Sequence, residues 1–600
     1  MRLYSFQRQF AYVSVLVSLL LCACRHSNNK DRPASSAAYL AALKKERIAA
    51  GQDSSAVKEK VWYKNSCIYT LDIKMFKDSD GDGIGDIKGL ISQLDYLQWL
   101  GADILWLPPF FPSPLQDDGY DISNFYAVDP RLGSMDDFKT LVQSVKSRGM
   151  HIIIDLVLNH TSNQHPWFQQ AKQSASTYHN WYLWSKKKPA NENAGMVFLG
   201  YQDGIWQYDS GAGQYYYHRF YNFEPDLNTQ YPAVKNEMDK VMRFWLSTGI
   251  DGFRVDAVTY LTEKANAEKK DAEFEHDYSL LQHIRQVANS ASPANIVLGE
   301  ASVMVDKTED FFGKHGEALS MIFNFYADQR IFYAMATEDI SKLRETLEAS
   351  AHTPLQSAWV YFLRNQDEMG MGKLSAKEKQ KVFEAFAPEE FMQLYKRGIR
   401  RRLAPMLNNQ QQRLRMAYSF LFSLQGVPML RYGDELGMGD NLTLTERLAV
   451  RTPMQWNDSN SSAGFSANSK TLRPVITDSV FSYHRINVAA AMNDNHSLLH
   501  YIRSFIQLRK KYPGIAYGRQ QFIDAGAASV LAVKYSWNGS QIFILHNFSG
   551  HAATATLNAT EIELPLQSIL PSQPTITVKN GKYNIILEPY GYRWLIIKQQ

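Results

Sequence analysis

The sequence predicts an α/β fold: a (β/α)8 TIM barrel with a lobe inserted after the third strand and an all-β domain at the C-terminal end. Eight short apolar runs, and the helical segments that alternate with them, predict the barrel. The gap between the third and fourth runs is too long for one helix, and this predicts the lobe. The chain has 600 residues, which exceeds one ordinary domain and suits a large barrel with attached domains.

The predicted strands are rich in Ile, Val, Leu and aromatic residues, as strands buried on both faces should be. They span residues 68–73, 102–107, 151–156, 252–256, 295–299, 321–325, 358–363 and 427–432. The barrel therefore takes residues 61–156 and 229–512. The lobe takes residues 157–228, where Trp, Tyr, Gly and Asn follow no helical period.

The clearest predicted helix spans residues 134–148. Ser134 can cap its first turn, Asp136 and Asp137 suit the positive end of the helix dipole, and Gly149 ends it. After residue 512 the pattern changes to short alternating strands separated by turns. A separate β-sandwich is predicted over 513–600, with strands at 530–535, 541–547 and 583–588.

The first 60 residues are predicted to be an export signal and a tether. Two arginines precede an apolar run, 10–23, that is shorter than the roughly 20 residues of a bilayer-spanning helix. The run ends in LCAC (21–24), the pattern of a bacterial lipoprotein cleavage site. We therefore predict a signal peptide over 1–24, a tether over 25–60 and membrane attachment only through a lipid on Cys24, outside the cytoplasm in the periplasm or at the outer membrane. An ordinary secretory signal and an uncleaved anchor are the alternatives.

Composition narrows the classes of partner. Lys plus Arg number 64 and Asp plus Glu number 60, and this near balance argues against a nucleic-acid binder. Aromatic residues make up 13% of the chain, which suits a ligand with flat apolar faces, such as a sugar, or a large core. Of the three cysteines, Cys67 is the only one beyond the signal region, so no intramolecular disulfide is predicted.

Polar side chains follow four of the predicted strands at their C-terminal ends, where barrels of this type place active sites. Arg254 and Asp256 are two apart on the fourth strand, so both leave the same face, and the guanidinium favours an ionised carboxylate. Alone, the pair fits either a nucleophile with its partner or a structural ion pair. Three carboxylates at matching strand ends favour the nucleophile. The set is Asp155, Asn159 and His160 after the third strand, Arg254 and Asp256 at the fourth, Glu300 at the fifth, and Asn365, Gln366 and Asp367 at the seventh.

Paired carboxylates are what glycoside hydrolysis requires: one attacks the anomeric carbon and another protonates the leaving oxygen. The segments DLVLNH (155–160), GFRVDAV (252–258), LGEA (298–301) and RNQDE (364–368) resemble the α-amylase superfamily of retaining glycoside hydrolases. The resemblance implies Asp256 as nucleophile, Glu300 as general acid/base and Asp367 as transition-state stabiliser. It also implies that Asp121 and His160 contact the sugar, with Gln366 beside them, and that Arg254 orients the nucleophile.

Within that superfamily the chain is most similar to the trehalose synthases, which are maltose α-glucosyltransferases. GIRRRLAPML (398–407) and RTPMQWND (451–458) support this. The resemblance implies small α-glucosides such as maltose or trehalose as substrates, and isomerisation with some hydrolysis. The alternatives are an extracytoplasmic α-glucosidase or α-amylase-type hydrolase of malto-oligosaccharides, and a catalytically impaired sugar-binding lipoprotein.

Three features depart from the pattern of these relatives. Gln366 stands where the family has His, so a weaker or altered contact with the sugar is expected. Glu224 stands where relatives usually have Gln, adding an acidic group near the base of the lobe. An export signal is also unexpected in a subgroup that is usually cytoplasmic.

Residues 78–86 alternate carboxylates with small residues, a pattern that suits Ca²⁺, which takes six to eight oxygen ligands. A solvated Asp-Gly turn is the alternative. The resemblance implies a calcium site formed by Asp78, Asp80, Asp82, the Ile84 carbonyl and Asp86. It implies a second metal site formed by Asn159, Asp226, Tyr260, Leu261 and Glu263. Four lobe aromatics fit either sugar stacking or lobe core: Trp167, Phe168, Trp181 and Trp184.

Overall fold

The computed structural model describes residues 61–559, 565–570, 576 and 578–598. The predicted signal peptide (1–24), Cys24 and the predicted tether (25–60) lie outside the described residues. Within those described ranges, no helix is both long and apolar enough to cross a membrane.

Eight parallel strands close into a barrel, which confirms the predicted fold class. The strands follow one another around the barrel in chain order, and β1 pairs with both β2 and β16. Their bounds are β1 Ile68–Thr70, β2 Ile104–Leu107, β3 His151–Leu156, β7 Gly252–Val255, β10 Ile296–Gly299, β11 Met321–Phe323, β12 Ala358–Phe362 and β16 Val427–Arg431.

The first strand is shorter than predicted because the side chain of Asp72 accepts a hydrogen bond from the backbone N–H of Lys74 and caps a short helix, α4 (Ile73–Phe76). The helix predicted at 134–148 is α7 (Met135–Ser147). Ser134 and Asp137 form a reciprocal capping box at its start. Gly149 follows its end with φ +73°.

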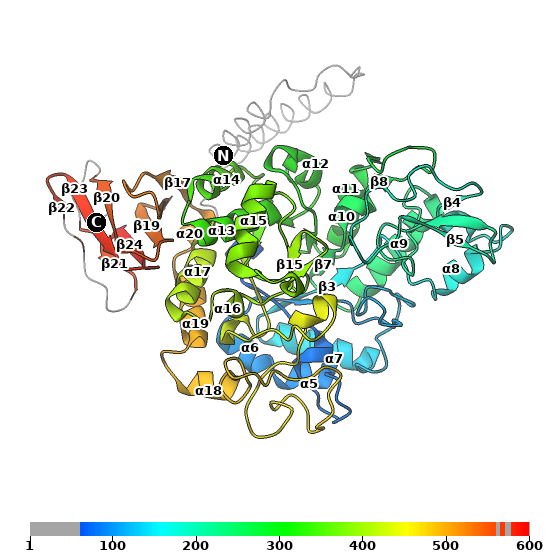
Figure 1. Cartoon of the computed structure of the whole chain (residues 1–600), viewed down its shortest axis with the longest axis horizontal. Helices are drawn as coiled ribbons and strands as arrows, with labels where there is room; N and C mark the ends of the chain where they lie inside the picture. Colours follow the sequence, from blue (N-terminus) through cyan, green and yellow to red (C-terminus); the bar gives the residue numbers. More distant parts are fainter. Residues whose placement is uncertain (1–60, 560–564, 571–575, 577, 599–600) are drawn as a thin grey trace, which may run out of the picture. The chain divides into compact units, whose positions relative to one another are not determined.

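The barrel strands are surrounded by helices (Figure 1). Helix α7 buries one apolar face, formed by Phe138, Leu141, Val142 and Val145. The other helices include α5 Ile87–Ser92, α6 Leu94–Leu100, α9 Pro232–Leu246, α11 Ser279–Ala291, α13 Phe325–Thr337, α14 Ser341–Ser350, α15 Ala376–Phe386, α17 Gln411–Ser423, α18 Val488–Asn493 and α19 Leu498–Lys511.

The stretch between β3 and α9 forms a lobe with its own small antiparallel sheet. It contains α8 (Pro166–Ala171) and the strands β4 Trp184–Ser185, β5 Trp206–Asp209 and β6 Gln214–Tyr217. The aromatics considered for sugar stacking pack on one another: the rings of Trp167 and Trp181 lie 4.9 Å apart, and those of Phe168 and Trp184 lie 5.7 Å apart. They therefore form lobe interior.

Two sheets form the C-terminal domain and share an apolar core, which includes Leu545, Leu557 and Ile585. One sheet holds β17 Arg519–Ile523, β18 Val530–Trp537, β19 Ser540–Asn547, β24 Tyr592–Lys598 and β21 Gln567–Ser568; the other holds β20 Ala553–Asn558, β23 Lys582–Leu587 and β22 Val578–Lys579.

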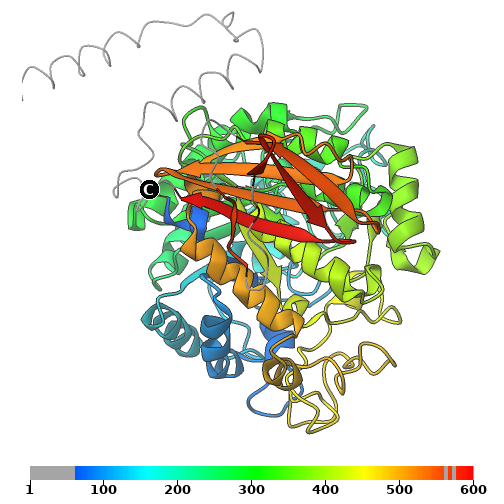
Figure 2. The ribbon, with the colours of Figure 1, turned by 90° about the vertical axis from the view of Figure 1, so that its left-hand side faces the viewer.

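The five-stranded sheet is not independent of the barrel, because its second face packs on barrel helices (Figure 2). The indole N–H of Trp594 donates to Ser419 Oγ at 2.9 Å. The hydroxyl of Tyr535 donates to the carbonyl of Ser423 at 2.6 Å. Both acceptors belong to α17, so the domain predicted as separate shares a continuous core with the barrel.

Candidate active site

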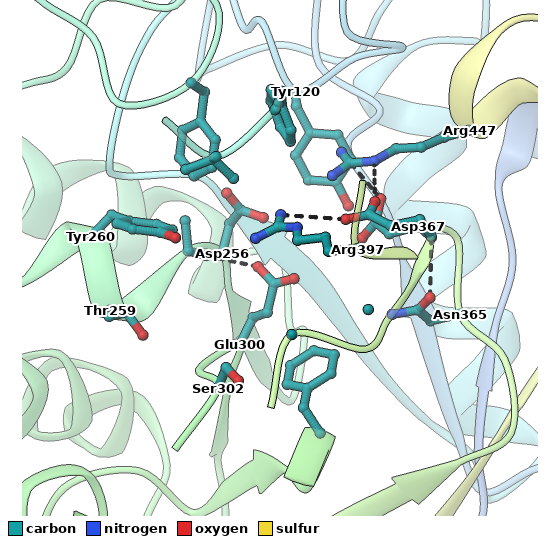
Figure 3. A pocket seen from close by; sticks show the side chains of 18 of the residues that line it. Tyr120, Asp256, Thr259, Tyr260, Glu300, Ser302, Asn365, Asp367, Arg397 and Arg447 are labelled. Carbon is teal, nitrogen blue, oxygen red and sulfur yellow. Dashed lines mark hydrogen bonds and ion pairs between the residues drawn. The ribbon is translucent and has the colours of Figure 1, made fainter. Parts of the chain in front are cut away.

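A cavity of about 420 Å³ opens at the C-terminal ends of the barrel strands. Asp256, Glu300 and Asp367 all line it, from the ends of β7, β10 and β12, and Figure 3 shows the three carboxyl groups facing the same space. The volume falls within the roughly 300–1,000 Å³ of small-molecule sites. The structure therefore brings the three predicted carboxylates together.

Arg254 is the centre of the charged network below the cavity. Its Nη1 donates to Asp155 Oδ1 at 2.8 Å and to Asp256 Oδ1 at 2.6 Å, and its Nη2 lies 3.0 Å from Glu300 Oε2. The side chain of Arg254 is only 1% exposed. One rigid guanidinium thus fixes the orientation of two carboxylates that face the cavity.

The turn after β7 completes this arrangement. Ala257 has φ +50°, in the left-handed region that residues other than glycine seldom adopt. Its backbone N–H donates to Glu300 Oε2 at 3.0 Å. Ala257 directly follows Asp256 in the chain, so this hydrogen bond fixes the position of Glu300 relative to Asp256.

Burial of Asp155 and Asp256 beside one guanidinium has an electrostatic consequence. Burial raises the pKa of Asp256 well above its usual range; Arg254 opposes this, and Glu300, Asp155 and Asp367 add to it. Burial likewise raises the pKa of Asp155 to about 6, against the effect of Arg254. The two buried carboxylates share one guanidinium, so the protonation of each depends on the other.

We expect Asp155→Asn to move the acid limb of the kcat/KM profile to lower pH. Asp155 raises the pKa of Asp256, so removing its charge lets Asp256 ionise at lower pH. The measurement is kcat/KM between pH 4 and 8. Asp103→Asn is the control: it removes a carboxylate that accepts from the Cys67 backbone at the other end of the barrel. An unmoved acid limb in Asp155→Asn would contradict the coupling.

Asp367 is held by arginines instead. Arg451 Nη2 donates to Asp367 Oδ1 at 2.9 Å, and Arg447 Nη1 lies 3.4 Å from the same oxygen. Burial raises its pKa, but Arg447 and Arg451 outweigh burial and leave the pKa below its usual range. Asp367 is therefore held ionised, as a stabiliser of positive charge in the transition state must be.

Two cavity residues, Arg397 and Arg447, were missed by sequence reasoning. Arg447 Nε donates to Glu368 Oε2 at 2.9 Å, and Arg397 Nη2 donates to Glu368 Oε1 at 3.4 Å. The sequence did indicate that arginines would lie here, because Glu368 directly follows Asp367 and a buried carboxylate needs a cationic partner.

Two predicted sugar contacts do not line the cavity. Asp121 is fully buried, and its oxygens accept from Ser113 Oγ at 2.8 Å and from the backbone N–H of Gln116 at 2.9 Å. Asp117, from the same DDGYD segment, lines the cavity instead. Gln366 donates from Nε2 to Tyr120 Oη at 3.1 Å and borders a separate small cavity.

His160 lines the cavity as predicted, and burial lowers its pKa to about 4, which makes it neutral at pH 7. Glu224 lines the same cavity from the lobe and is 1% exposed. Its Oε1 lies 3.7 Å from His160 Nε2. Burial, with Asp117 and Asp121 nearby, raises the pKa of Glu224 well above its usual range.

The first predicted metal set forms a compact cluster in part. Carboxylate oxygens of Asp78, Asp80 and Asp86 lie within 4.8 Å of one another. Asp82 is not part of that group; its Oδ1 accepts from the backbone N–H of Ile84 at 2.7 Å. Carboxylate oxygens at this spacing fit a hard cation.

The second predicted metal set surrounds an arginine. Arg219 Nη2 donates to Glu263 Oε1 at 3.0 Å, its guanidinium carbon lies 4.8 Å from the centre of the Tyr260 ring, and its backbone N–H donates to Asp226 Oδ1 at 2.9 Å. Asn159 bonds to the side chain of Asp226, and the Leu261 carbonyl accepts from Thr229 Oγ1 at 3.2 Å. The guanidinium of Arg219 therefore lies among the side chains that were predicted to hold the second metal.

The barrel and its carboxylates define a carbohydrate-active enzyme of the glycoside hydrolase type. The α-amylase catalytic domain matches residues 68–518, so this chain belongs to the α-amylase family. Residues 539–596 match a sucrose hydrolase-like C-terminal domain.

The trehalose synthase/amylase TreS of Mycobacterium tuberculosis is 38% identical over 559 residues, covering 91% of this chain and 92% of that protein. The oligo-1,6-glucosidase of Parageobacillus thermoglucosidasius is 30% identical over 557 residues, covering 82% and 91%. A crystal structure of a variant of trehalulose synthase MutB in complex with Tris superposes with a TM-score of 0.73 at 25% identity, covering 89% of this chain and 100% of that chain.

Proposed function

We propose that this protein converts maltose into trehalose, with some hydrolysis, through a glucosyl ester on Asp256. The observation that carries the proposal is the guanidinium of Arg254, which holds Asp256 and Glu300 side by side at the cavity. Carboxylates held this close favour the retaining arrangement, in which they lie about 5 Å apart and one of them is the nucleophile.

The steps follow from the positions of these groups. Asp256 attacks the anomeric carbon while Glu300 gives a proton to the departing oxygen, which releases glucose. Asp367, held ionised by its arginines, stabilises the positive charge that develops on the sugar. The freed glucose then offers its anomeric hydroxyl, Glu300 removes the proton, and the bond to Asp256 breaks to give trehalose. Water in place of glucose gives hydrolysis.

Contacts between the lobe and the barrel favour return of glucose over entry of water. Tyr221 of the lobe shares a hydrogen bond of 3.0 Å with Tyr395 and donates to Glu446 Oε2 at 2.9 Å. Phe198, which lines the cavity, packs on Tyr395 with ring centres 4.8 Å apart. These contacts cover one side of the cavity, and exclusion of water is what a transfer reaction needs.

The test is incubation of purified protein with maltose, with trehalose and glucose resolved by anion-exchange chromatography. We expect trehalose as the main product and glucose as the minor one. Glucose without trehalose would replace the proposal with hydrolysis, the activity that oligo-1,6-glucosidases among the relatives carry in their name. Unchanged maltose would leave only a sugar-binding role.

We further propose that Asp78, Asp80 and Asp86 hold one Ca²⁺ ion, with Asp82 and the Ile84 carbonyl beside them. Their oxygens are close enough to share an ion, and a carboxylate keeps lone pairs after accepting backbone hydrogen bonds. Bound in 100-fold excess over its Kd, the ion would add about 2.7 kcal/mol to the free energy of unfolding. At the second set, Arg219 supplies the charge, so one ion per chain is expected.

We expect Asp78→Asn to lose the ion and to melt at the temperature of wild type treated with EDTA. Metal analysis gives the stoichiometry and thermal melting gives the stability. Asp203→Asn, at an exposed position in the lobe, should keep both at wild-type values. A wild type that melts identically with and without EDTA would support the solvated turn.

We also propose that the chain is carried outside the cytoplasm and anchored by a lipid on Cys24, on the strength of the LCAC pattern at residues 21–24. In cells fed labelled palmitate, the wild type should take up label and fractionate with membranes. Cys24→Ala should do neither. Wild-type protein that takes up no label and stays in the soluble fraction would contradict the lipid anchor.

A further inference from the structure

The carboxyl group of Glu224 lines the cavity, but the proposed reaction does not use this group. It follows β6 in the lobe and lines the cavity together with His160 and Asp256. Its Oε2 accepts from the backbone N–H of Tyr221 at 3.3 Å. Its Oε1 is buried and has no hydrogen-bond partner among the described residues.

A second unpartnered atom lies in the same corner. His160 Nε2 is buried, has no hydrogen-bond partner in the described part of the chain, and lies 3.7 Å from Glu224 Oε1. That separation is too long for a direct hydrogen bond. Buried polar atoms seldom lack partners, and one hydroxyl group can donate to one atom while accepting from another.

We propose that Glu224 and His160 hold one hydroxyl of the glucosyl residue between them, which makes Glu224 a specificity-determining residue of the cavity. The inference rests on the proposed function. Gln366 does not compete for this place, because it does not line the cavity and its amide donates to Tyr120 Oη.

The charged groups near Glu224 and His160 indicate which kind of substrate group fits between them. Asp117 and Asp256 line the same cavity, so Glu224 adds a third acidic group to one region. A neutral sugar hydroxyl fits there, whereas a phosphorylated sugar would meet three carboxyl groups. Lys373, Arg397 and Arg447 also line the cavity, so this preference for an uncharged hydroxyl applies to the place between Glu224 and His160.

The test pairs removal of the carboxyl group with removal of single sugar hydroxyls. The substrates are p-nitrophenyl α-glucoside and its 3-, 4- and 6-deoxy analogues, and the readout is kcat/KM. Glu224→Met removes hydrogen bonding at nearly the same size, and Glu224→Gln keeps a donor and an acceptor. Glu224→Ala repeats the test with a smaller side chain if the Met variant does not fold.

Wild type should discriminate against one analogue by about tenfold or more. Glu224→Met should lose that discrimination through KM, and Glu224→Gln should keep most of it. Glu435→Gln, in a buried carboxyl bonded to Tyr69 and Tyr96, is the control that should keep the wild-type pattern. Equal discrimination by wild type and Glu224→Met for every analogue would overturn the inference.

Failure of the proposed function is read separately, from the products formed from maltose, and a wild type inactive on every glucoside leaves no kcat/KM to compare. The contact is then measured by calorimetry with maltose. Weaker binding to Glu224→Met than to wild type and Glu224→Gln would support the contact, and equal binding of all three would overturn it.

Discussion

We expect Asp256→Asn to lower kcat for maltose by roughly 10⁴-fold, the largest effect of any single substitution in the cavity. The amide has the shape of the carboxylate and can still accept from Arg254 Nη1, which is 2.6 Å away in the wild type. It cannot form the glucosyl ester. KM should change little, because the sugar contacts remain.

Asp251→Asn is the matched control for the nucleophile. Asp251 precedes the same strand at its opposite end, where its carboxylate accepts from the backbone N–H of Ile152 at 3.0 Å and lies 3.3 Å from Lys146. This variant should keep the wild-type kcat. Steady-state assay of both variants decides the assignment, which fails if Asp256→Asn keeps a tenth of the wild-type rate.

The second large effect is expected for Glu300→Gln, with a loss of about 10²–10⁴-fold in kcat on maltose. Glu300 protonates the sugar oxygen as it departs, a step that glucosyl fluoride does not need. The loss on glucosyl fluoride should therefore be much smaller, and added azide should restore turnover by replacing the acceptor that Glu300 deprotonates.

The measurement is the ratio of the two losses, taken from initial rates on maltose and on glucosyl fluoride. Because Glu300 also accepts from the backbone N–H of Ala257, thermal melting of the variant checks that the turn is intact. Equal losses on both substrates, with no effect of azide, would assign the proton transfer elsewhere.

Much of the barrel could be predicted from sequence because its strands are buried on both faces. Such strands appear as short apolar runs, and β12 is buried at all five positions. The catalytic carboxylates could be predicted from the same runs, since each follows the end of a strand. The run IFIL in β19 also indicated that the C-terminal domain packs on the barrel, because a continuous apolar run is typical of a strand covered on both faces. In the structure, the last six residues of β19 are all buried.

Side-chain direction on loops could not be predicted in this way. Asp117 and Asp121 are four residues apart on one loop, and the hydrogen bond from Ser113 turns Asp121 away from the cavity. Gln366 lies between two cavity residues but donates to Tyr120. Arg219 lies among the residues of the second predicted metal site because the fold brings it to Glu263, 44 residues further along the chain.

The central claim is a covalent glucosyl group on Asp256, and peptide mass spectrometry tests it most directly. Protein treated with 5-fluoro-glucosyl fluoride, whose ester is hydrolysed slowly, is digested with pepsin at low pH and its peptides are weighed. The predicted result is one added fluoroglucosyl mass on the peptide that holds Asp256, absent from Asp256→Asn. The same mass on a peptide holding Glu300 or Asp367, or no labelled peptide at all, would contradict it.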